Sequence, residues 1–513
     1  MGPGMKRFLL LKLLLSFSIT LFAFSLVLSP ILAYQSWTYP VDISNLPTGS
    51  HSQRIVVDRN CGLHVIWIES GWPTSPTSEL YYATKPANES WSTPERVSTI
   101  LNSSFGPALA IDSQNNLHAV WTDETFPIQK IYYSSKSLTG VWSEPIVISQ
   151  PENYSHFPSI AIDSQDTLYV AWSYTLPGQN DIFYIYKSVG GSWSQPVNIS
   201  NTSNPSYNPS LVTDASGNIY AVWQELVAPD NFEIFFNQKS AGGNWGNPID
   251  ISNTPSGSPT PAWWLTRLVS DPQGNLHVGW REEFYDASGT TQYGTFYVSK
   301  TSSGWSQVEK ISTAFAGGPD FVVDQAGTVH VVWGQAAGNM NIFYKSKPLG
   351  GSWSAPLAIS QLLADSFEGS ITADSQNLYV VFMNNSVGDS DIFFVTSKIP
   401  YKVTWLPPLS TQEIYTMHDG ATLPVKFNLT NPDGSQATDA AVNVVITENA
   451  TETEWFSGPA VYDPTLPGYS AKVSTKGWPL GEYTISLVGD RLVHDATYGL
   501  VLVETGKGKG KQK

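Results

Sequence analysis

Three of the seven arginines in the chain occupy positions from which they could bind an anion. Arg54 and Arg267 each lie four residues before the aspartate of a recurring turn, and Arg281 directly follows Trp280. A planar guanidinium group binds a carboxylate or a sulfate through two parallel hydrogen bonds. Asp320 takes the place of these arginines in another copy of the pattern. Two interpretations stay open: the arginines bind an acidic ligand, or one of them pairs with Asp320 or a loop glutamate and braces the fold.

A second set of candidates combines carboxylates with aromatic rings near the ends of the same recurring segments. Carboxylates accept hydrogen bonds from sugar hydroxyls, and aromatic rings stack on the C–H faces of sugars. We therefore expect a carbohydrate-binding face, with the alternative that these carboxylates only solvate loops and that several of the rings are buried. The set consists of Glu69, Glu225, Glu282, Trp72, Trp263 and Trp264.

The composition argues against other classes of function. A net charge of −16 opposes binding to a nucleic-acid backbone, because such binding depends on clustered cations. No histidine or cysteine cluster has the spacing of metal ligands, so we expect neither a metal nor a cofactor. We assign no catalytic residue. His64, His118, His277 and His330 share a repeat position that tyrosine fills elsewhere, which indicates packing between blades and not metal binding.

The elements that must position these residues belong to a repeat. An apolar segment such as Leu117–Trp121 occurs seven times, at spacings of roughly 50 residues, which is typical of four-stranded propeller blades. A residue type that recurs at the same position in all copies is expected to serve packing that every blade requires. We therefore interpret the repeated tryptophans as core residues. A single binding site must instead lie where the copies differ. The aromatic residues that end the seven segments are Trp67, Trp121, Trp172, Trp223, Trp280, Trp333 and Phe382.

The seventh copy lacks the outer strand that the other copies have. That strand has the form Trp193-Ser-Gln-Pro-Val-Asn-Ile-Ser200, and its missing counterpart stands at the other end of the chain, as Trp37-Thr-Tyr-Pro-Val-Asp-Ile-Ser44. The sequence therefore predicts an all-β fold with a seven-bladed β-propeller that an N-terminal strand closes. Short hairpins are expected on one face, and the irregular connections on the other.

Residues 36–400 resemble the Asp-box, or BNR-repeat, propellers of the sialidase superfamily. Ser188-Val-Gly-Gly-Ser-Trp193 keeps the Ser, Gly and Trp of the family's turn but lacks its Asp, so the resemblance supports the fold better than the activity. Leu423-Pro-Val-Lys-Phe427 resembles a microbial surface module named for a Pro-x-Lys-Phe motif, which implies a β-sandwich. Family enzymes use three arginines, a Tyr-Glu nucleophile pair and an Asp acid/base. Arg54 and Arg267 match at the strand start, but no third arginine there and no Tyr-Glu pair can be assigned.

The order of the segments suggests an exported protein. Lys6 and Arg7 precede an apolar run, which is the layout of a signal peptide or of an uncleaved N-terminal anchor. We expect residues 1–33 to be this leader, 34–400 the propeller, 401–505 a β-sandwich of immunoglobulin-like type, and 506–513 a disordered basic tail. The expected location is secreted or cell-surface, with membrane contact only through a retained anchor.

Two functions remain open at this stage. The first is binding of a glycan or of another surface protein, and the second is sialidase-like hydrolysis of an acidic glycan. The sequence does not determine the oligomeric state.

Overall fold

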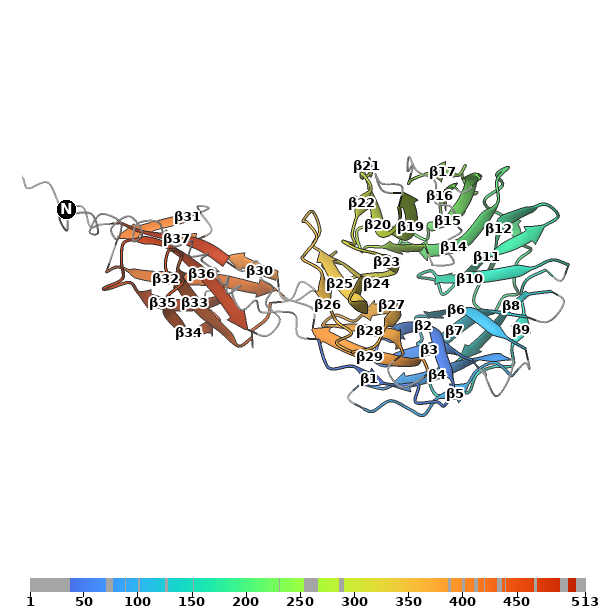
Figure 1. Ribbon diagram of the computed structural model, residues 1–513, viewed down its shortest axis with the longest axis horizontal. Coiled ribbons are helices and arrows are strands. Elements are labelled where there is room, and N and C mark those ends of the chain that lie inside the picture. Colours follow the sequence, from blue (N-terminus) through green and yellow to red (C-terminus); the bar gives the residue numbers. More distant parts are fainter. Residues whose placement is uncertain are drawn as a thin grey trace, which may run out of the picture.

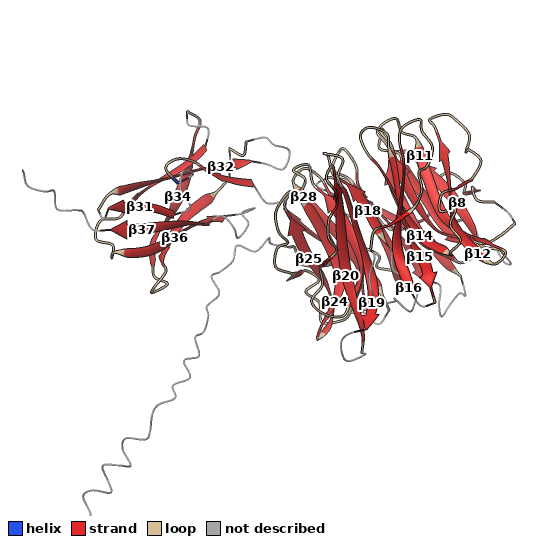
Figure 2. Ribbon diagram, turned by 90° about the horizontal axis from the view of Figure 1, so that it is seen from above, coloured by secondary structure: helices blue, strands red, loops and turns tan. Residues whose placement is uncertain are grey.

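The computed structural model describes residues 37–503 except 71–76, 88, 100–101, 125–127, 151, 230, 253–265, 286–289, 386–388, 399–401, 410–413, 419, 431–435, 439, 466–467 and 490–496. The regular elements of these residues are strands, and Figure 2 shows them joined by loops throughout. None of the described residues forms a helix that could cross a bilayer. The predicted leader lies outside the described residues.

Seven sheets form a β-propeller, as the repeat predicts, and each sheet pairs its strands in antiparallel order from the inside outward (Figure 1). We number the blades from the one that begins with β2. The innermost strands are β2 (Gly49–Val57), β6 (Ser104–Ile111), β10 (Ser155–Ile162), β14 (Ser206–Thr213), β18 (Arg267–Ser270), β23 (Ala316–Val323) and β27 (Ser366–Ala373).

The second and third strands of each blade form its buried middle. The second strands are almost wholly buried, because both faces of a central strand are covered by neighbouring blades. The second strands are β3 (Leu63–Ser70), β7 (Leu117–Asp123), β11 (Leu168–Leu176), β15 (Ile219–Ala228), β19 (Leu276–Tyr285), β24 (Val329–Ala337) and β28 (Asn377–Asn384). The third strands are β4 (Ser78–Lys85), β8 (Lys130–Lys136), β12 (Gln179–Lys187), β16 (Asn231–Lys239), β20 (Thr291–Thr301), β25 (Asn339–Lys347) and β29 (Asp391–Lys398).

The outer strands are short, and blade five has two of them on β20. They are β5 (Glu95–Arg96), β9 (Ile146–Val147), β13 (Val197–Asn198), β17 (Ile249–Asp250), β21 (Gly304–Trp305), β22 (Glu309–Lys310) and β26 (Leu357–Ala358), while blade seven uses β1 (Val41–Asp42).

The N-terminal strand closes the ring. In β1, Val41 lies opposite Phe394 and Asp42 opposite Phe393 of β29, and the N–H of Ile43 donates to the Ile392 carbonyl at 2.8 Å. Trp37 meets the ring of Tyr344 edge-on, with centroids 5.3 Å apart. This confirms the predicted closure, which removes an open sheet edge.

The contact of Trp37 repeats at every junction between blades. In each case a tryptophan beside the outer strand packs edge-on against an aromatic ring on the third strand of the preceding blade, which is a favoured aromatic geometry. These outer tryptophans therefore seal the junctions between blades, and all but Trp37 are half-buried. The tryptophans that end the second strands, which we interpreted as core residues, are fully buried. The other pairs are Trp91–Phe394, Trp142–Tyr82, Trp193–Tyr133, Trp245–Tyr184, Trp305–Phe236 and Trp353–Tyr297.

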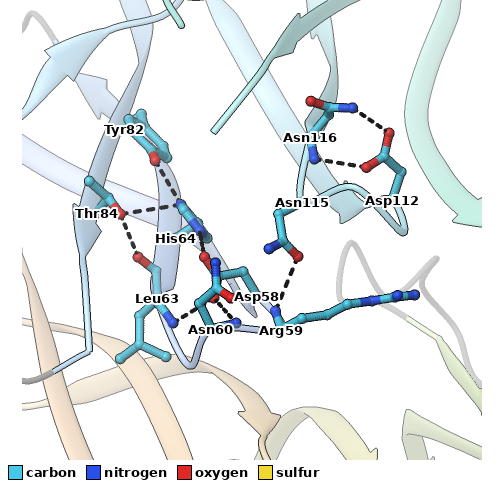
Figure 3. A network of polar contacts seen from close by, with 11 residues as sticks. Asp58, Arg59, Asn60, Leu63, His64, Tyr82, Thr84, Asp112, Asn115 and Asn116 are labelled. Carbon is cyan, nitrogen blue, oxygen red and sulfur yellow. Dashed lines mark hydrogen bonds and ion pairs between the residues drawn. The ribbon is translucent and has the colours of Figure 1, made fainter. Parts of the chain in front are cut away.

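One aspartate organises the hairpin between the two inner strands of each blade. In blade one, Asp58 Oδ1 accepts hydrogen bonds from the N–H groups of Asn60 and Gly62, at 2.8 and 2.7 Å. The ring of His64 lies between this turn and the third strand, with Nε2 3.2 Å from Asp58 Oδ2 and Nδ1 2.7 Å from the Tyr82 hydroxyl (Figure 3). Where tyrosine replaces the histidine, its hydroxyl donates to the turn aspartate directly, as in Tyr169, Tyr220 and Tyr379.

The C-terminal unit is a single eight-stranded sheet that curls around its own core, so the predicted second all-β unit is confirmed (Figure 1). β34 joins the two halves of this sheet, because its first part pairs with β33 and its second part with β35. In sheet order the strands are β30 (Lys402–Trp405), β32 (Thr422–Thr430), β35 (Gly468–Ser474), β34 (Glu454–Asp463), β33 (Val442–Glu448), β36 (Gly481–Gly489), β37 (Thr497–Val503) and β31 (Ile414–His418).

Candidate functional site

The inner strands are irregular near their starts. All of them except β18, whose described part begins at Arg267, have a β-bulge there; in β2 it lies between His51 and Arg54. A bulge inserts an extra residue and redirects the nearby side chains. In five blades the residue six positions before the turn aspartate has a left-handed backbone, with φ between 52° and 59°. These residues are Ser52, Gly106, Phe157, Asn208 and Glu368.

A cavity of about 340 Å³ lies among these bulges, around the axis of the ring. Six inner strands contribute to it, from every blade except the fourth. Most of its lining residues lie near the starts of the inner strands. Its charged lining residues are Arg54, Arg267, Arg281, Asp320 and Glu368, and its large apolar ones are Phe105, Phe157, Phe315, Phe367 and Met340.

Arg267 forms an ion pair across blades five and six, with its Nε 3.1 Å from Asp320 Oδ1. The other oxygen of Asp320 accepts from the Ser370 hydroxyl at 2.8 Å and from the Ile371 N–H at 3.1 Å. Asp320 therefore links three neighbouring blades. The bracing interpretation holds for Arg267, although its guanidinium group still lines the cavity.

Arg54, unlike Arg267, forms no ion pair among the described residues. One of its terminal nitrogens donates to the Gln53 carbonyl at 2.6 Å. Its buried Nε has no hydrogen-bond partner there, and the Nε of Arg267 has only the ion pair with Asp320. Burial and the nearby positive charge of Arg267 lower the pKa of Arg54 to about 9, against the opposing pull of Asp320 and Glu368. The group is still protonated at neutral pH. Its charge is thus incompletely compensated by the protein.

Arg281 reaches the same cavity from the second strand of blade five. Its Nε donates to the Ala316 carbonyl at 3.1 Å, and its guanidinium carbon lies 4.3 Å from the centre of the Tyr293 ring. Burial lowers the pKa of Arg281, and Tyr293 and Glu283 offset part of that shift. Cation–π packing fixes the plane of the guanidinium group. All three arginines singled out in the sequence therefore meet at one cavity.

The repeat position of Arg54 and Arg267 has a structural role in other blades. Ser159 Oγ accepts a hydrogen bond from the N–H of Leu211 in the next blade at 3.0 Å, and Ser210 accepts one from Leu268 at 3.1 Å. Arginine has no acceptor and cannot make this link. The two arginines therefore replace an interblade bond with positive charge on the axis.

The glutamates predicted from the second strands lie elsewhere. Glu69, Glu225 and Glu282 are buried and do not line the cavity. Each accepts a hydrogen bond from the indole Nε1 of the tryptophan two residues earlier, at 3.1, 2.8 and 2.9 Å. Burial raises the pKa of Glu69 and of Glu225. Alternation along a strand places residues two apart on one side, which explains the pairing. The predicted aromatic candidates Trp72, Trp263 and Trp264 lie outside the described residues.

Sequence reasoning missed Glu368 and the phenylalanines of the cavity. The signal was available in the alignment of the repeats, because the position six residues before the turn aspartate differs strongly between blades. Gly106 and Gly318 occupy it in blades two and six, whereas Phe157 and Glu368 occupy it in blades three and seven. Regular strand alternation did not reveal that a bulge turns this position into the cavity.

No protein-family model and no curated protein sequence matches the chain. Solved structures that match include an ulvan lyase bound to -[GlcA(1-4)Rha3S]-, at 13% identity and a TM-score of 0.49, with 70% of this chain and 93% of that chain covered. A novel fungal alcohol oxidase in complex with copper matches at 13% identity and a TM-score of 0.48, with 91% of this chain and 100% of that chain covered. A Hadza microbial sialidase matches at 15% identity and a TM-score of 0.38, with 63% of this chain and 73% of that chain covered. Likeness at these values concerns the architecture and does not bear on activity.

Proposed function

We propose that this protein is an extracytoplasmic β-propeller that binds the carboxylate or sulfate group of an acidic glycan in the cavity on its axis. The convergence of Arg54, Arg267 and Arg281 on one cavity is the observation that supports this most directly. Guanidinium groups bind such planar or tetrahedral anions in a fixed geometry. The surrounding phenylalanine rings offer surfaces for the C–H faces of a sugar.

The charge of the site favours an anionic ligand. Arg54 has an unpartnered buried nitrogen and lies beside the positive charge of Arg267, which makes its protonated state less favourable than in water. An anion between these groups would supply the missing partner and the compensating charge. The leader-like N-terminal sequence supports placement outside the cytoplasm, with the C-terminal unit as a spacer or adhesion module.

A second candidate function is sialidase-like hydrolysis of an acidic glycan. The observation that favours it is the pairing of Glu283 with Tyr293, which lie directly opposite each other on β19 and β20, next to Arg281. The resemblance to Asp-box enzymes implies a Tyr-Glu nucleophile beside three arginines. Tyr293 is not among the residues that line the cavity, so binding without turnover ranks first.

The test measures binding of the full chain to an array of carboxylated and sulfated glycans and their neutral counterparts. We expect the wild type to bind acidic members, and the double variant Arg54→Ala, Arg267→Ala to lose about hundredfold in affinity, since charge-assisted hydrogen bonds contribute about 1.5–3 kcal/mol each. Arg59→Ala is the control, because Arg59 is an exposed arginine in an inner-strand hairpin, away from the cavity.

Equal affinity for acidic and neutral glycans in the wild type would contradict the proposal, as would an equal loss from Arg59→Ala. A parallel panel of fluorogenic glycosides separates the two functions. Turnover that the double variant abolishes would establish the hydrolase instead.

A further inference from the structure

Glu368 occupies a repeat position that has no acidic residue in the other blades. It lies at the bulge of β27 with φ at 52°, in the left-handed region where a side chain is disfavoured and glycine is not. Blades two and six have Gly106 and Gly318 at the same repeat position. The ring therefore forms with no side chain here. The same backbone conformation accommodates serine, phenylalanine and asparagine in blades one, three and four, so it does not require a glutamate. Packing therefore does not account for a carboxylate on the wall of the cavity.

The carboxylate of Glu368 is held by one of its two oxygens. Oε2 accepts a hydrogen bond from the N–H of Ser52 in blade one at 2.9 Å, and the main-chain carbonyl of Glu368 accepts from the Gln53 side chain. Among the described residues, no hydrogen bond reaches Oε1. An ionised carboxylate accepts several hydrogen bonds, so this oxygen retains acceptor capacity within an anchored group.

The negative charge of Glu368 also disfavours binding of an anion that has no hydrogen-bond donor. It lines the same cavity as Arg54, and its negative charge acts on that arginine. A ligand that carries only a negative charge meets repulsion from Glu368. A ligand that carries a hydroxyl beside its anionic group can donate a hydrogen bond to Oε1 while the arginines bind the anion.

We infer that Glu368 reads a hydroxyl group on the ligand, so that the cavity selects hydroxylated acids such as a uronate ring over simple carboxylates. The inference rests on the proposed function, since it requires that an anion bind among the arginines. It adds the condition that the bound anionic group belongs to a residue with a hydrogen-bond donor next to it.

The test compares glucuronate with cyclohexanecarboxylate, which has a six-membered ring and the same charge but no hydroxyl. Titration calorimetry or ligand-observed NMR on the full chain gives both affinities. We expect the wild type to prefer glucuronate at least tenfold. Glu368→Gly, which copies blades two and six, should weaken glucuronate binding by about tenfold to hundredfold, the range for a hydrogen bond to a charged group.

The two ligands should respond in opposite directions. Removal of Glu368 should strengthen cyclohexanecarboxylate binding severalfold, because the repulsion is lost. Glu368→Gln keeps a carbonyl acceptor without the charge and should retain part of the preference for glucuronate. Asn208→Gly is the matched control, since Asn208 has the same backbone conformation in blade four but does not line the cavity. It should change neither affinity.

Two outcomes overturn the inference in different ways. If Glu368→Gly weakens both ligands alike at an unchanged melting temperature, Glu368 braces Arg54 and reads no hydroxyl, while anion binding stands. If the wild type binds neither acid, the proposed function fails, and the inference fails with it.

Discussion

The hairpin turns and the axial cavity differ in how similar the residues of the seven blades are at equivalent positions. At the turns every blade has an aspartate, and a histidine or tyrosine on the second strand contacts it in one of two related networks. The position six residues before the turn aspartate holds serine, glycine, phenylalanine, asparagine, leucine or glutamate. Positions with the same residue in every blade serve the packing that all blades require. Positions where the residue differs between blades are where a single site on the axis can form.

The difference also separates two uses of charged groups. The turn aspartates have their acceptors occupied by backbone N–H groups and by a histidine or tyrosine, and they stabilise the hairpin locally. Arg54 has a buried donor without a partner. Buried polar groups in folded proteins usually have a hydrogen-bond partner, so an unpartnered nitrogen on a charged group calls for an explanation. If the two kinds of site are independent, altering a repeated feature should change stability without changing binding at the cavity.

The largest effect is expected from the closure of the ring. Deleting residues 34–46 removes β1, the Trp37–Tyr344 contact and the hydrogen bonds from the Ser44 region to β29. The last blade would expose β29 as an edge, and we expect loss of cooperative unfolding or a fall in melting temperature of more than 10 °C. Differential scanning calorimetry measures this.

Deletion of residues 506–513 serves as the control for this truncation and should leave the melting temperature unchanged. A truncation of residues 34–46 that melts like the wild type would mean that β1 contributes little to the ring, against its pairing in the sheet.

A smaller effect is expected from exchanging the two turn networks. In blade two, His118 contacts the Tyr133 hydroxyl at 2.9 Å, whereas in blade four Tyr220 stacks on Phe236 and bonds to the turn aspartate. His118→Tyr alone should cost about 1–2 kcal/mol, because the Tyr133 hydroxyl loses its partner. Adding Tyr133→Phe should restore most of that loss. Denaturant unfolding of both single variants and the double variant gives the coupling.

If the losses of unfolding free energy in the two single variants simply add in the double variant, the two networks are not interchangeable. Anion binding should be unaffected in all three variants, since the turn lies away from the cavity.

A third effect, which depends on pH, concerns acid stability. Burial lowers the pKa of His156, next to Phe157 at the bulge, to about 4, against roughly 6.5 in an unfolded chain. Between these values the unfolded state binds the proton more readily, so stability falls as the pH falls from about 6.5 towards 4. Burial raises the pKa of Asp391 to about 6, which acts in the opposite direction. His156→Phe isolates the first contribution.

Melting temperatures at pH 7 and pH 4.5 measure the difference. The wild type should lose more stability on acidification than His156→Phe, and equal losses in the two proteins would contradict the assignment.

Much of the fold followed from the chain alone. The recurring Leu-x-x-x-Trp segments predicted seven blades, and the match of residues 37–44 to the outer strands predicted the closure. These features repeat, so each copy supports the interpretation of the others. The aspartate turns were predicted for the same reason, because their partners lie within the same hairpin. The shared histidines were predicted to pack between blades, but they contact the turn aspartate and a tyrosine of their own blade instead.

The ring, its closure and the place of Arg54 and Arg267 on inner strands could therefore be predicted from the chain alone. The folded structure was needed to show that Arg281, from a second strand, and Glu368, from a bulge, join them at one cavity. It also showed that Glu69, Glu225 and Glu282 bond to tryptophans of their own strands. A bulge breaks the two-residue alternation along a strand, so the direction of side chains beside it does not follow from the sequence. Residues from different blades also meet on the axis only once the ring is closed.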